Sequence, residues 1–274
     1  MMMGKGPFGE QAHSPSEIVL TPEEKQKLRN GKFKVGISFH YSGNAWTHLH
    51  ETAIRNTLEN FGISVVSVSD ARFDPELQLA QLEALAMQKP DLIIAIPVDD
   101  KVTSDKFRRL SRHSKLVFMS NVPEGLKKTE YCTCVSVNES ENGANIGDLM
   151  GEYFAGRNNI KAVFIMHGTP FYGTHLRDMS ARQEIIDRYR NIDICAYGRF
   201  EAFEDAYEEC RKMIEAHPDI EAMYVTWDRP ALEVIRALKD IGREDVSVFT
   251  ADLDLEIGKY LGAGRIVKGI SSQR

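Results

Sequence analysis

The chain has 274 residues, of which 42% are hydrophobic and 27% are charged. These proportions are those of ordinary globular proteins and exclude a disordered or membrane-embedded chain. The length suits two α/β domains rather than one. The formal net charge of −6 supplies no positive field for a phosphate backbone, so nucleic acid is excluded as a partner.

Residues 1–32 differ from the rest of the chain. They begin with three methionines, contain scattered glycine, proline and serine, and lack the apolar core of a signal peptide. We interpret this stretch as a leader or a mobile linker. No export signal is visible, and no apolar run approaches the ~20 residues that span a bilayer.

From residue 33 onward, short apolar runs rich in β-branched residues alternate with amphipathic stretches. Such alternation indicates βαβ units and a parallel sheet. Helices are predicted at 46–60, 75–88 and 103–113 and between the later strands, and a glycine at every fourth position within 143–154 indicates close helix packing. The predicted strands are 33–39, 63–68, 92–96, 116–119 and 132–137, then 161–166, 193–197, 222–226, 246–250 and 266–270. Because the pattern repeats, we predict an α/β fold with two doubly wound parallel sheets.

Ligands of open parallel sheets bind beyond the carboxyl ends of the strands, so functional residues are sought there. Two of these positions hold the two tryptophans of the chain, Trp46 and Trp227. An indole is a flat apolar plate with one N–H donor, which suits the C–H face of a sugar ring. The alternative is that both are core residues. If they are binding plates, Trp227→Ala weakens binding with little change in the fold.

Polar side chains near the tryptophans are suited to bind hydroxyl groups. Asn44, Asp228, Asp252 and Gln273 carry amide or carboxylate groups that each engage two neighbouring hydroxyls. Helix capping is the alternative for Asp228 and Asp252, since each precedes a helical stretch. His40 ends a strand and is a candidate donor to a ligand oxygen, with a structural histidine as the alternative.

Metal, cofactor and catalytic chemistry find little support in the sequence. His48 and His50 are two apart on a predicted helix and point to different faces, so no metal site is expected. Asp99 and Asp100 are interpreted as cap or turn residues. No dinucleotide, P-loop or nucleophile-elbow motif is present, so no cofactor and no enzyme activity are expected. The cysteines expected to be free and mostly buried are Cys132, Cys134, Cys195 and Cys210.

The strand-end residues fall in stretches that resemble the type I periplasmic binding proteins, in particular the ribose-type sugar-binding components of bacterial ABC importers. These stretches are residues 34–46, 90–99, 117–123, 222–228 and 268–274. The resemblance implies two Rossmann-like lobes, 33–137 and 138–271, joined by a hinge, with 272–274 starting a return crossing. Since relatives continue beyond this point, we expect a truncated chain with an exposed apolar patch on the first lobe.

The resemblance also implies binding residues in the first lobe. Asn44 and Trp46 match the amide and the aromatic plate that this lobe places on the sugar. Ser120 and Asn121 stand where many relatives have Asp and Arg. The first lobe is therefore expected to bind a ligand with groups that differ from those of the ribose-type relatives.

In the second lobe, Trp227 and Asp228 occupy the strand end where the family offers an amide and an acid. Asp252 and Gln273 match a hydroxyl-binding acid and a hinge glutamine.

Near the usual position of a ligand-clamping arginine stands His175, and Arg177 is close enough to replace that arginine. The predicted ligand-binding residues are His40, Asn44, Trp46, Ser120, Asn121, His175, Arg177, Trp227, Asp228, Asp252 and Gln273.

The function implied by the resemblance is capture of a monosaccharide or similar polyol for an ABC-type importer by hinge closure. The expected partners are the sugar or polyol and the membrane permease, the expected state is a monomer, and the implied location is periplasmic or extracellular and lipid-anchored. The alternative is a ligand-sensing domain of a transcriptional regulator or sensor of the same fold, although no helix-turn-helix precedes residue 33.

Overall fold

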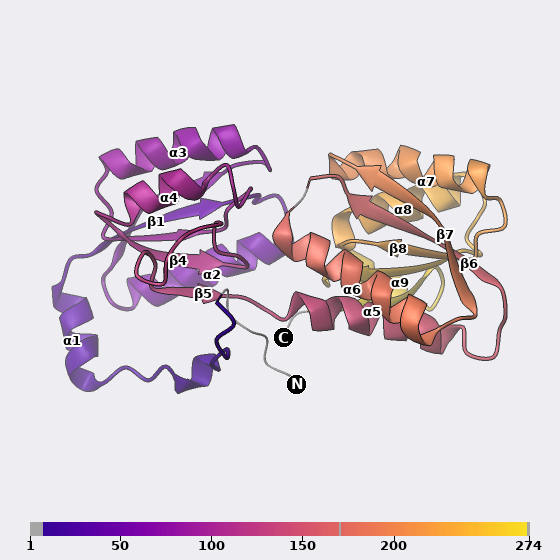
Figure 1. The fold of residues 1–274 in the computed structure, drawn as a ribbon, viewed down its shortest axis with the longest axis horizontal. Coiled ribbons are helices and arrows are strands. Elements are labelled where there is room, and N and C mark those ends of the chain that lie inside the picture. Colours follow the sequence, from indigo (N-terminus) through magenta and orange to yellow (C-terminus); the bar gives the residue numbers. More distant parts are fainter. Residues whose placement is uncertain (1–7, 170, 273–274) are drawn as a thin grey trace. The chain divides into compact units, whose positions relative to one another are not determined.

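A computed structural model describes residues 8–169 and 171–272 of the chain. The chain forms two compact units, and the boundary between them lies between Val137 and Asn138 (Figure 1). Each unit contains a five-stranded sheet in which neighbouring strands run parallel. The predicted α/β fold with two parallel sheets is confirmed.

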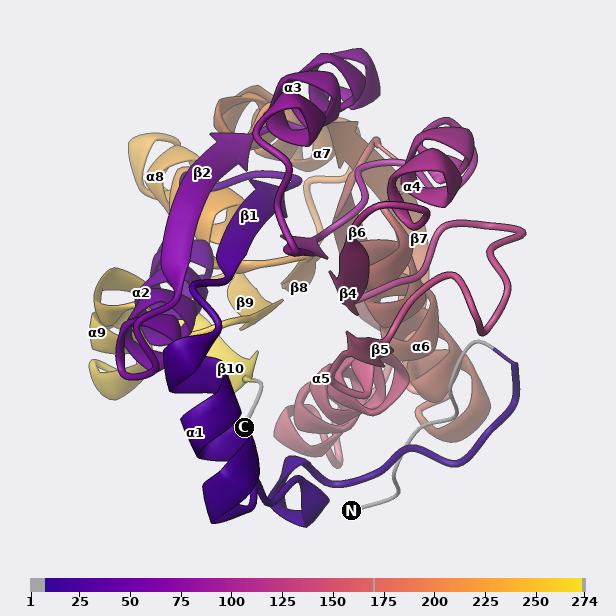
Figure 2. The same ribbon diagram turned by 90° about the vertical axis from the view of Figure 1, so that its left-hand side faces the viewer.

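The first unit contains the sheet β2-β1-β3-β4-β5. Helices α3 and α4 cover one face of this sheet, and α2 lies on the other (Figure 2). The strands are β1 (Lys34–Phe39), β2 (Ser64–Asp70), β3 (Leu92–Ala95), β4 (Lys115–Met119) and β5 (Thr133–Val135). The helices are η1 (Pro15–Glu17), α1 (Pro22–Asn30), α2 (Ala45–Glu59), α3 (Pro75–Met87) and α4 (Ser104–Leu110).

The two faces of the first sheet are covered to different extents. On one face, Leu82 of α3 and Phe107 of α4 pack with buried Phe118 of β4 in a hydrophobic cluster. On the opposite face, Val117 is half-buried and Val135 is 53% exposed. An apolar strip near β5 therefore remains in contact with solvent.

The second unit contains the sheet β10-β9-β8-β6-β7. Read from the β7 edge, this order is β7-β6-β8-β9-β10, which repeats the order of the first sheet. The strands are β6 (Ile160–His167), β7 (Ile192–Phe200), β8 (Ala222–Val225), β9 (Ser247–Ala251) and β10 (Val267–Ser271). The helices are α5 (Glu139–Tyr153), α6 (Tyr172–Arg188), η2 (Phe203–Asp205), α7 (Ala206–Ala216), α8 (Asp228–Asp240) and α9 (Leu255–Gly262).

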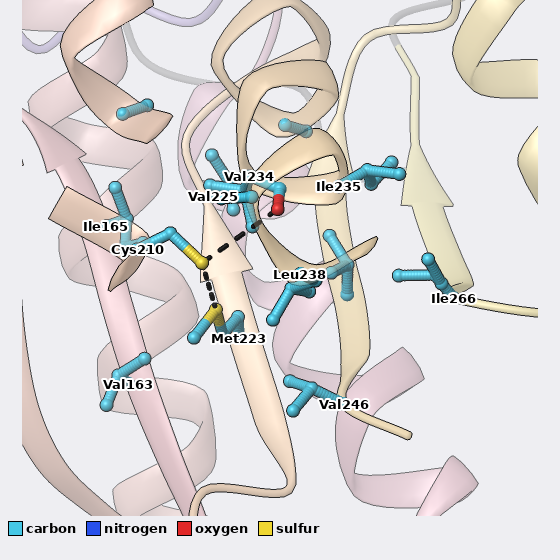
Figure 3. Packing of buried hydrophobic residues seen from close by; sticks show 14 of the residues in the cluster. Val163, Ile165, Cys210, Met223, Val225, Val234, Ile235, Leu238, Val246 and Ile266 are labelled. Carbon is cyan, nitrogen blue, oxygen red and sulfur yellow. Dashed lines mark hydrogen bonds between the residues drawn. The ribbon is translucent and has the colours of Figure 1, made fainter. Parts of the chain in front are cut away.

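The core between the second sheet and helices α7, α8 and α9 is built mainly from aliphatic side chains (Figure 3) and also contains Phe200 and Trp227. Cys210 of α7 lies at its centre, with its Sγ 3.8 Å from Sδ of Met223 and 3.8 Å from the carbonyl oxygen of Val234. The thiol is fully buried. Cys210 therefore acts as a small core residue.

Helices α5 and α6 pack closely on the other face of the second sheet because α5 presents glycines. A Cβ atom on Gly143 would collide with the carbonyl oxygen of Arg177, and one on Gly147 would lie 2.9 Å from that of Ala181. The predicted small-residue face within 143–154 is confirmed.

The observed strands agree with the predicted ones to within a residue or two, with one exception. β7 continues to Phe200 and pairs with β6 up to that residue, with one register shift at Cys195. The predicted strand 132–137 is the short strand β5. The four cysteines are free, but only Cys210 is buried and Cys132 is exposed, so the expectation of mostly buried thiols is wrong.

Part of the N-terminal stretch interpreted as a linker is helical. Helix α1 begins with a capping box, in which Thr21 Oγ1 accepts from the Glu24 N–H at 3.2 Å and Glu24 Oε2 accepts from the Thr21 N–H at 2.8 Å. Thr-x-x-Glu with Pro22 at the first helical position is a start signal that the linker interpretation overlooked. Among the described helices, none combines the length and the apolarity that crossing a bilayer demands.

Candidate functional site

The residue that follows the fourth strand has the same conformation in both sheets. Ser120 follows β4 with a φ of 69°, and Asp252 follows β9 with a φ of 61°. Each donates its N–H at 2.9 Å to the last residue of the fifth strand, Val135 and Ser271 respectively. The chain therefore turns sharply out of each sheet at a position where the sequence predicts a ligand-binding side chain.

In the first unit, His40 follows β1 and is 8% exposed. Its ring lies edge-on to Phe73 at 5.1 Å and to Trp46 at 6.4 Å between centroids. Trp46 is half-buried near the start of α2, and its indole packs against His50 with centroids 4.0 Å apart. The structure thus brings the predicted indole and His40 into one aromatic group, to which Phe73 and Tyr41 also belong.

Asn44 has a local role that the sequence interpretation did not include. It is the N-cap of α2, and its Oδ1 accepts from the N–H and the hydroxyl of Thr47 at 2.9 and 2.8 Å. Capping occupies the amide oxygen and leaves the amide nitrogen as the group suited to a ligand.

Asn121 follows Ser120 and is buried next to Asp100. The Nδ2 group donates to Asp100 Oδ1, while the buried Oδ1 has no hydrogen-bond partner within the part of the chain that the structure describes. Burial raises the pKa of Asp100 to about 6, against the lowering effect of Asn121. Asp99 caps the following turn by accepting from the N–H groups of residues 101 and 102 at 2.8 Å, as predicted.

In the second unit, Arg177 of α6 links the start of α5 to the residues that follow β8 and β9. Nε and Nη2 donate to the two carboxylate oxygens of Glu139 at 2.8 and 3.0 Å, and Nη1 donates to the Thr226 carbonyl at 3.1 Å and to Asp252 at 3.3 Å. Arg177 is 4% exposed. Burial alone would lower its pKa, but the charges of Asp252 and Glu139 outweigh burial and raise the pKa above its ordinary value.

Asp252 belongs to this buried ion-pair group. Burial raises the pKa of its carboxyl group, while Arg177 opposes the rise. The capping alternative for Asp252 is wrong, because the N-cap of α9 is Asp254, which accepts from the N–H groups of Glu256 and Ile257 at 2.8 Å.

Asp228 lies nearby as the first residue of α8 and is 6% exposed. The N-cap position itself belongs to Trp227, which makes no side-chain cap bond, so Asp228 is not the cap residue either. Burial and then the charges of Asp252 and Asp254 raise the pKa of Asp228 to about 7. The second unit therefore carries a carboxyl-rich surface balanced by the guanidinium group of Arg177.

Trp227 follows β8 but packs largely within its own unit. It is 6% exposed, belongs to the hydrophobic cluster of α7 and α8, and lies edge-on to His167 at 5.1 Å and Phe200 at 5.2 Å. The Trp227 ring is therefore largely a core side chain, which is the alternative to a binding plate that the sequence left open. Removal of so large a buried side chain costs stability, so Trp227→Ala is expected to lower the free energy of unfolding as well as to weaken binding.

Among the described residues, no group of three His, Cys, Asp or Glu side chains has the arrangement of a metal site. The carboxyl-rich surface of the second unit instead offers hydrogen-bond acceptors to a ligand that carries several donors.

A family model of the periplasmic binding protein domain matches residues 35–274. The chain belongs to this family. The resemblance inferred from the strand-end stretches is thereby confirmed. A comparison with curated protein sequences gives no match.

Solved structures share the fold of this periplasmic binding protein domain. A carbohydrate transporter solute binding protein from Agrobacterium radiobacter, in complex with D-arabinose, has 16% identity and a TM-score of 0.80 over 88% of this chain and 83% of that chain. The periplasmic component of an ABC-type sugar transport system from Hahella chejuensis has 13% identity and a TM-score of 0.79, with 87% of each chain covered. The Caulobacter myo-inositol binding protein, bound to myo-inositol, has 16% identity and a TM-score of 0.77 over 86% and 80%.

Two predicted residues of this periplasmic binding protein domain stand apart from the groups above. His175 is exposed on α6, two residues before the buried Arg177. Gln273 lies outside the described residues. Arg177, rather than His175, therefore binds the carboxylates of Glu139 and Asp252.

The sequence interpretation missed three side chains of these groups. Glu139 is the carboxylate that binds Arg177 at two points, and its position just after the predicted lobe boundary was a usable signal. Asp178 accepts from the hydroxyl of Tyr224 at 2.7 Å, and burial raises its pKa to about 7. Phe73 lies beyond β2, at a strand end that was left out of the search.

Proposed function

We propose that this chain is a solute-binding protein that captures a monosaccharide or a similar polyol. The supporting observation is that polar groups and aromatic rings gather at the carboxyl ends of the strands in both parallel sheets. Amides and carboxylates bind the hydroxyls of a polyol, while rings suit its C–H faces. Two proteins of the same fold are in complex with D-arabinose, a monosaccharide, and with myo-inositol, a cyclic polyol.

In this proposal, Arg177 and Asp252 bind ligand hydroxyls from the second unit. Arg177 keeps one Nη2 hydrogen beyond its bonds to Glu139 and the β8 end, and Asp252 keeps further acceptor capacity. The buried Oδ1 of Asn121 supplies an acceptor from the first unit. The other residues of the proposed set are His40, Asn44, Trp46, Ser120, His175, Trp227, Asp228 and Gln273.

We further propose that the two units close around the ligand by rotation of the connecting chain and that an importer permease binds the closed form. Closure is stabilised only by contacts that the ligand makes in the closed state. The proposed activity is binding without chemical conversion, by a monomer in the periplasm. The expected assignment of residues 33–137 and 138–271 to the two closing lobes is part of this proposal.

The experiment is a thermal-shift screen of pentoses, hexoses, deoxysugars and cyclic and linear polyols, followed by calorimetric titration of the best ligand. A ligand that binds only the folded protein raises the melting temperature. We expect at least one polyol to raise it by several degrees at millimolar concentration. A screen in which no polyol changes the melting temperature contradicts the proposal.

A matched pair of variants localises the binding. Asp252→Asn removes a carboxylate bonded to Arg177 but keeps a residue that tolerates positive φ, whereas Asp254→Asn replaces one good N-cap residue by another in the same loop. We expect Asp252→Asn to weaken sugar binding about tenfold and Asp254→Asn to leave it unchanged. Equal affinities in the two variants would remove Asp252 from the proposed set.

A further inference from the structure

Phe73 has an unusual backbone conformation. It lies beyond β2, at the same end of the first sheet as His40. Its φ is 61°, and the φ of Arg72 before it is 52°. The left-handed region is uncommon for residues other than glycine, and for a bulky side chain it is an outlier. Such conformations cost free energy and persist where the surrounding structure holds them, often at functional sites.

Hydrogen bonds from neighbouring strand ends hold this loop. The Phe73 N–H donates to the His40 carbonyl at 2.8 Å, and the Arg72 N–H donates to Asp70 Oδ1 at 2.8 Å. Asp70 Oδ2 accepts from the Ser42 hydroxyl at 2.7 Å. The backbone of Phe73 is therefore held next to the end of β1.

The Phe73 ring lies among the aromatic side chains of the candidate site. It stacks on Tyr41, with centroids 5.0 Å apart and planes at 14°, and meets His40 edge-on at 5.1 Å. Phe73 is half-buried. These rings form an apolar wall at the carboxyl end of β1.

In the second unit, a phenylalanine packs against the histidine that ends β6 from a position inside the neighbouring strand rather than beyond its end. Phe200 ends β7, the strand equivalent to β2, and its ring lies 5.4 Å from that of His167. Phe200 is 2% exposed, covered in part by Trp227, and belongs to a regular strand. Packing alone therefore does not require the left-handed backbone that presents Phe73 half-buried.

We propose that Phe73 is a ligand-contacting residue whose ring lies against the C–H face of a cyclic polyol and selects cyclic over linear polyols. This inference rests on the proposed function and narrows the ligand class. A pyranose, furanose or cyclitol ring has a contiguous face of C–H groups that stacks on an aromatic ring, whereas a linear alditol must lose conformational entropy to present one.

The test compares Phe73→Asn and Phe73→Tyr with wild type. Asparagine adopts a positive φ readily, so Phe73→Asn is expected to keep or raise the melting temperature without ligand. Its affinity for the cyclic probe, D-arabinose or myo-inositol, whichever stabilises wild type more, is expected to fall about tenfold. Affinity for D-arabinitol should change less, and Phe73→Tyr should retain the wild-type preference.

The control is Phe61→Asn, which removes a half-buried ring just before β2, at the opposite end of that strand. It should lower the melting temperature without altering the affinity ratio of cyclic to linear polyol. The inference is overturned if Phe73→Asn leaves the cyclic affinity unchanged, or if it lowers the unliganded melting temperature as much as Phe61→Asn does. The sugar response of wild type decides the proposed function separately.

Discussion

Ser120 and Asp252 occupy equivalent positions in the two sheets, each in the left-handed region and each bonded to the end of the fifth strand. For a β-branched side chain this conformation is strongly unfavourable. We predict that Ser120→Val lowers the free energy of unfolding by roughly 1–2 kcal/mol, whereas Ser120→Gly has no cost. The same exchange at Ser67, inside β2, is the control in urea unfolding, where valine suits the extended backbone. Equal losses at both serines would contradict the prediction.

The buried hydrogen bond between Tyr224 and Asp178 gives a second prediction. Tyr224→Phe removes one of the two hydroxyl donors of the buried carboxyl group of Asp178, the other being Thr226, and loss of a buried hydrogen bond costs about 1 kcal/mol. Tyr207 donates to Asp240 at a similar distance of 2.8 Å on the surface, so Tyr207→Phe is the matched control with a smaller effect. Denaturant unfolding of both variants measures the difference, and similar values would show that burial does not matter here.

Arg177 is predicted to be essential for the stability of the second unit. Arg177→Met leaves Glu139 and Asp252 buried without their cation, and breaking a buried pair in this way costs roughly 3–5 kcal/mol. Arg188→Met removes an arginine that is 58% exposed and pairs with Asp148 and Glu184. Chemical denaturation should find Arg188→Met close to wild type and Arg177→Met strongly destabilised. Comparable losses would mean that solvent screens the buried cluster.

The raised pKa of Asp228 predicts a pH dependence of stability. Its folded pKa of about 7 exceeds the unfolded value of 3.8, so between these values the folded protein holds a proton that the unfolded chain has released. Stability therefore falls as pH rises through this window, by up to about 1.4 kcal/mol per pH unit, and the loss is complete above about pH 7.

Asp228→Asn removes this contribution, so its gain over wild type should be larger at pH 8 than at pH 4 in thermal unfolding. Asp178, whose pKa is also about 7, retains its own share in the variant. The exposed Asp187 of α6 provides the control, since Asp187→Asn should follow the wild-type curve. A gain that is constant with pH would contradict a protonated Asp228.

The fold was predictable because parallel strands that are covered on both faces read as apolar runs. The run at Ile160–His167 is an example, with six of its residues buried. β7 extends beyond its predicted end because Gly198 and Arg199 have little strand preference of their own and are held by pairing with β6. Helix α1 was missed because its start signal lies in a stretch of irregular composition.

The sequence predicted which strand ends carry the candidate site, but it did not predict which side chains bind one another there. The bond between Arg177 and Asp252 joins residues 75 apart in the chain, and that between Arg177 and Glu139 joins residues 38 apart. Sequence spacing carries no signal for such pairs. The burial of Trp227 was likewise hidden, because it depends on Phe200 and His167 from other strands.

Glu139 is the second residue after the boundary between the two units. Its two bonds to Arg177 connect the first turn of α5, through α6, to the ends of β8 and β9. In the proposed closure, these bonds would make α5, α6 and the ends of β8 and β9 move as one block. The groups that surround Asp252 would keep their mutual distances during this closure, because the bonds that hold them lie within the second unit.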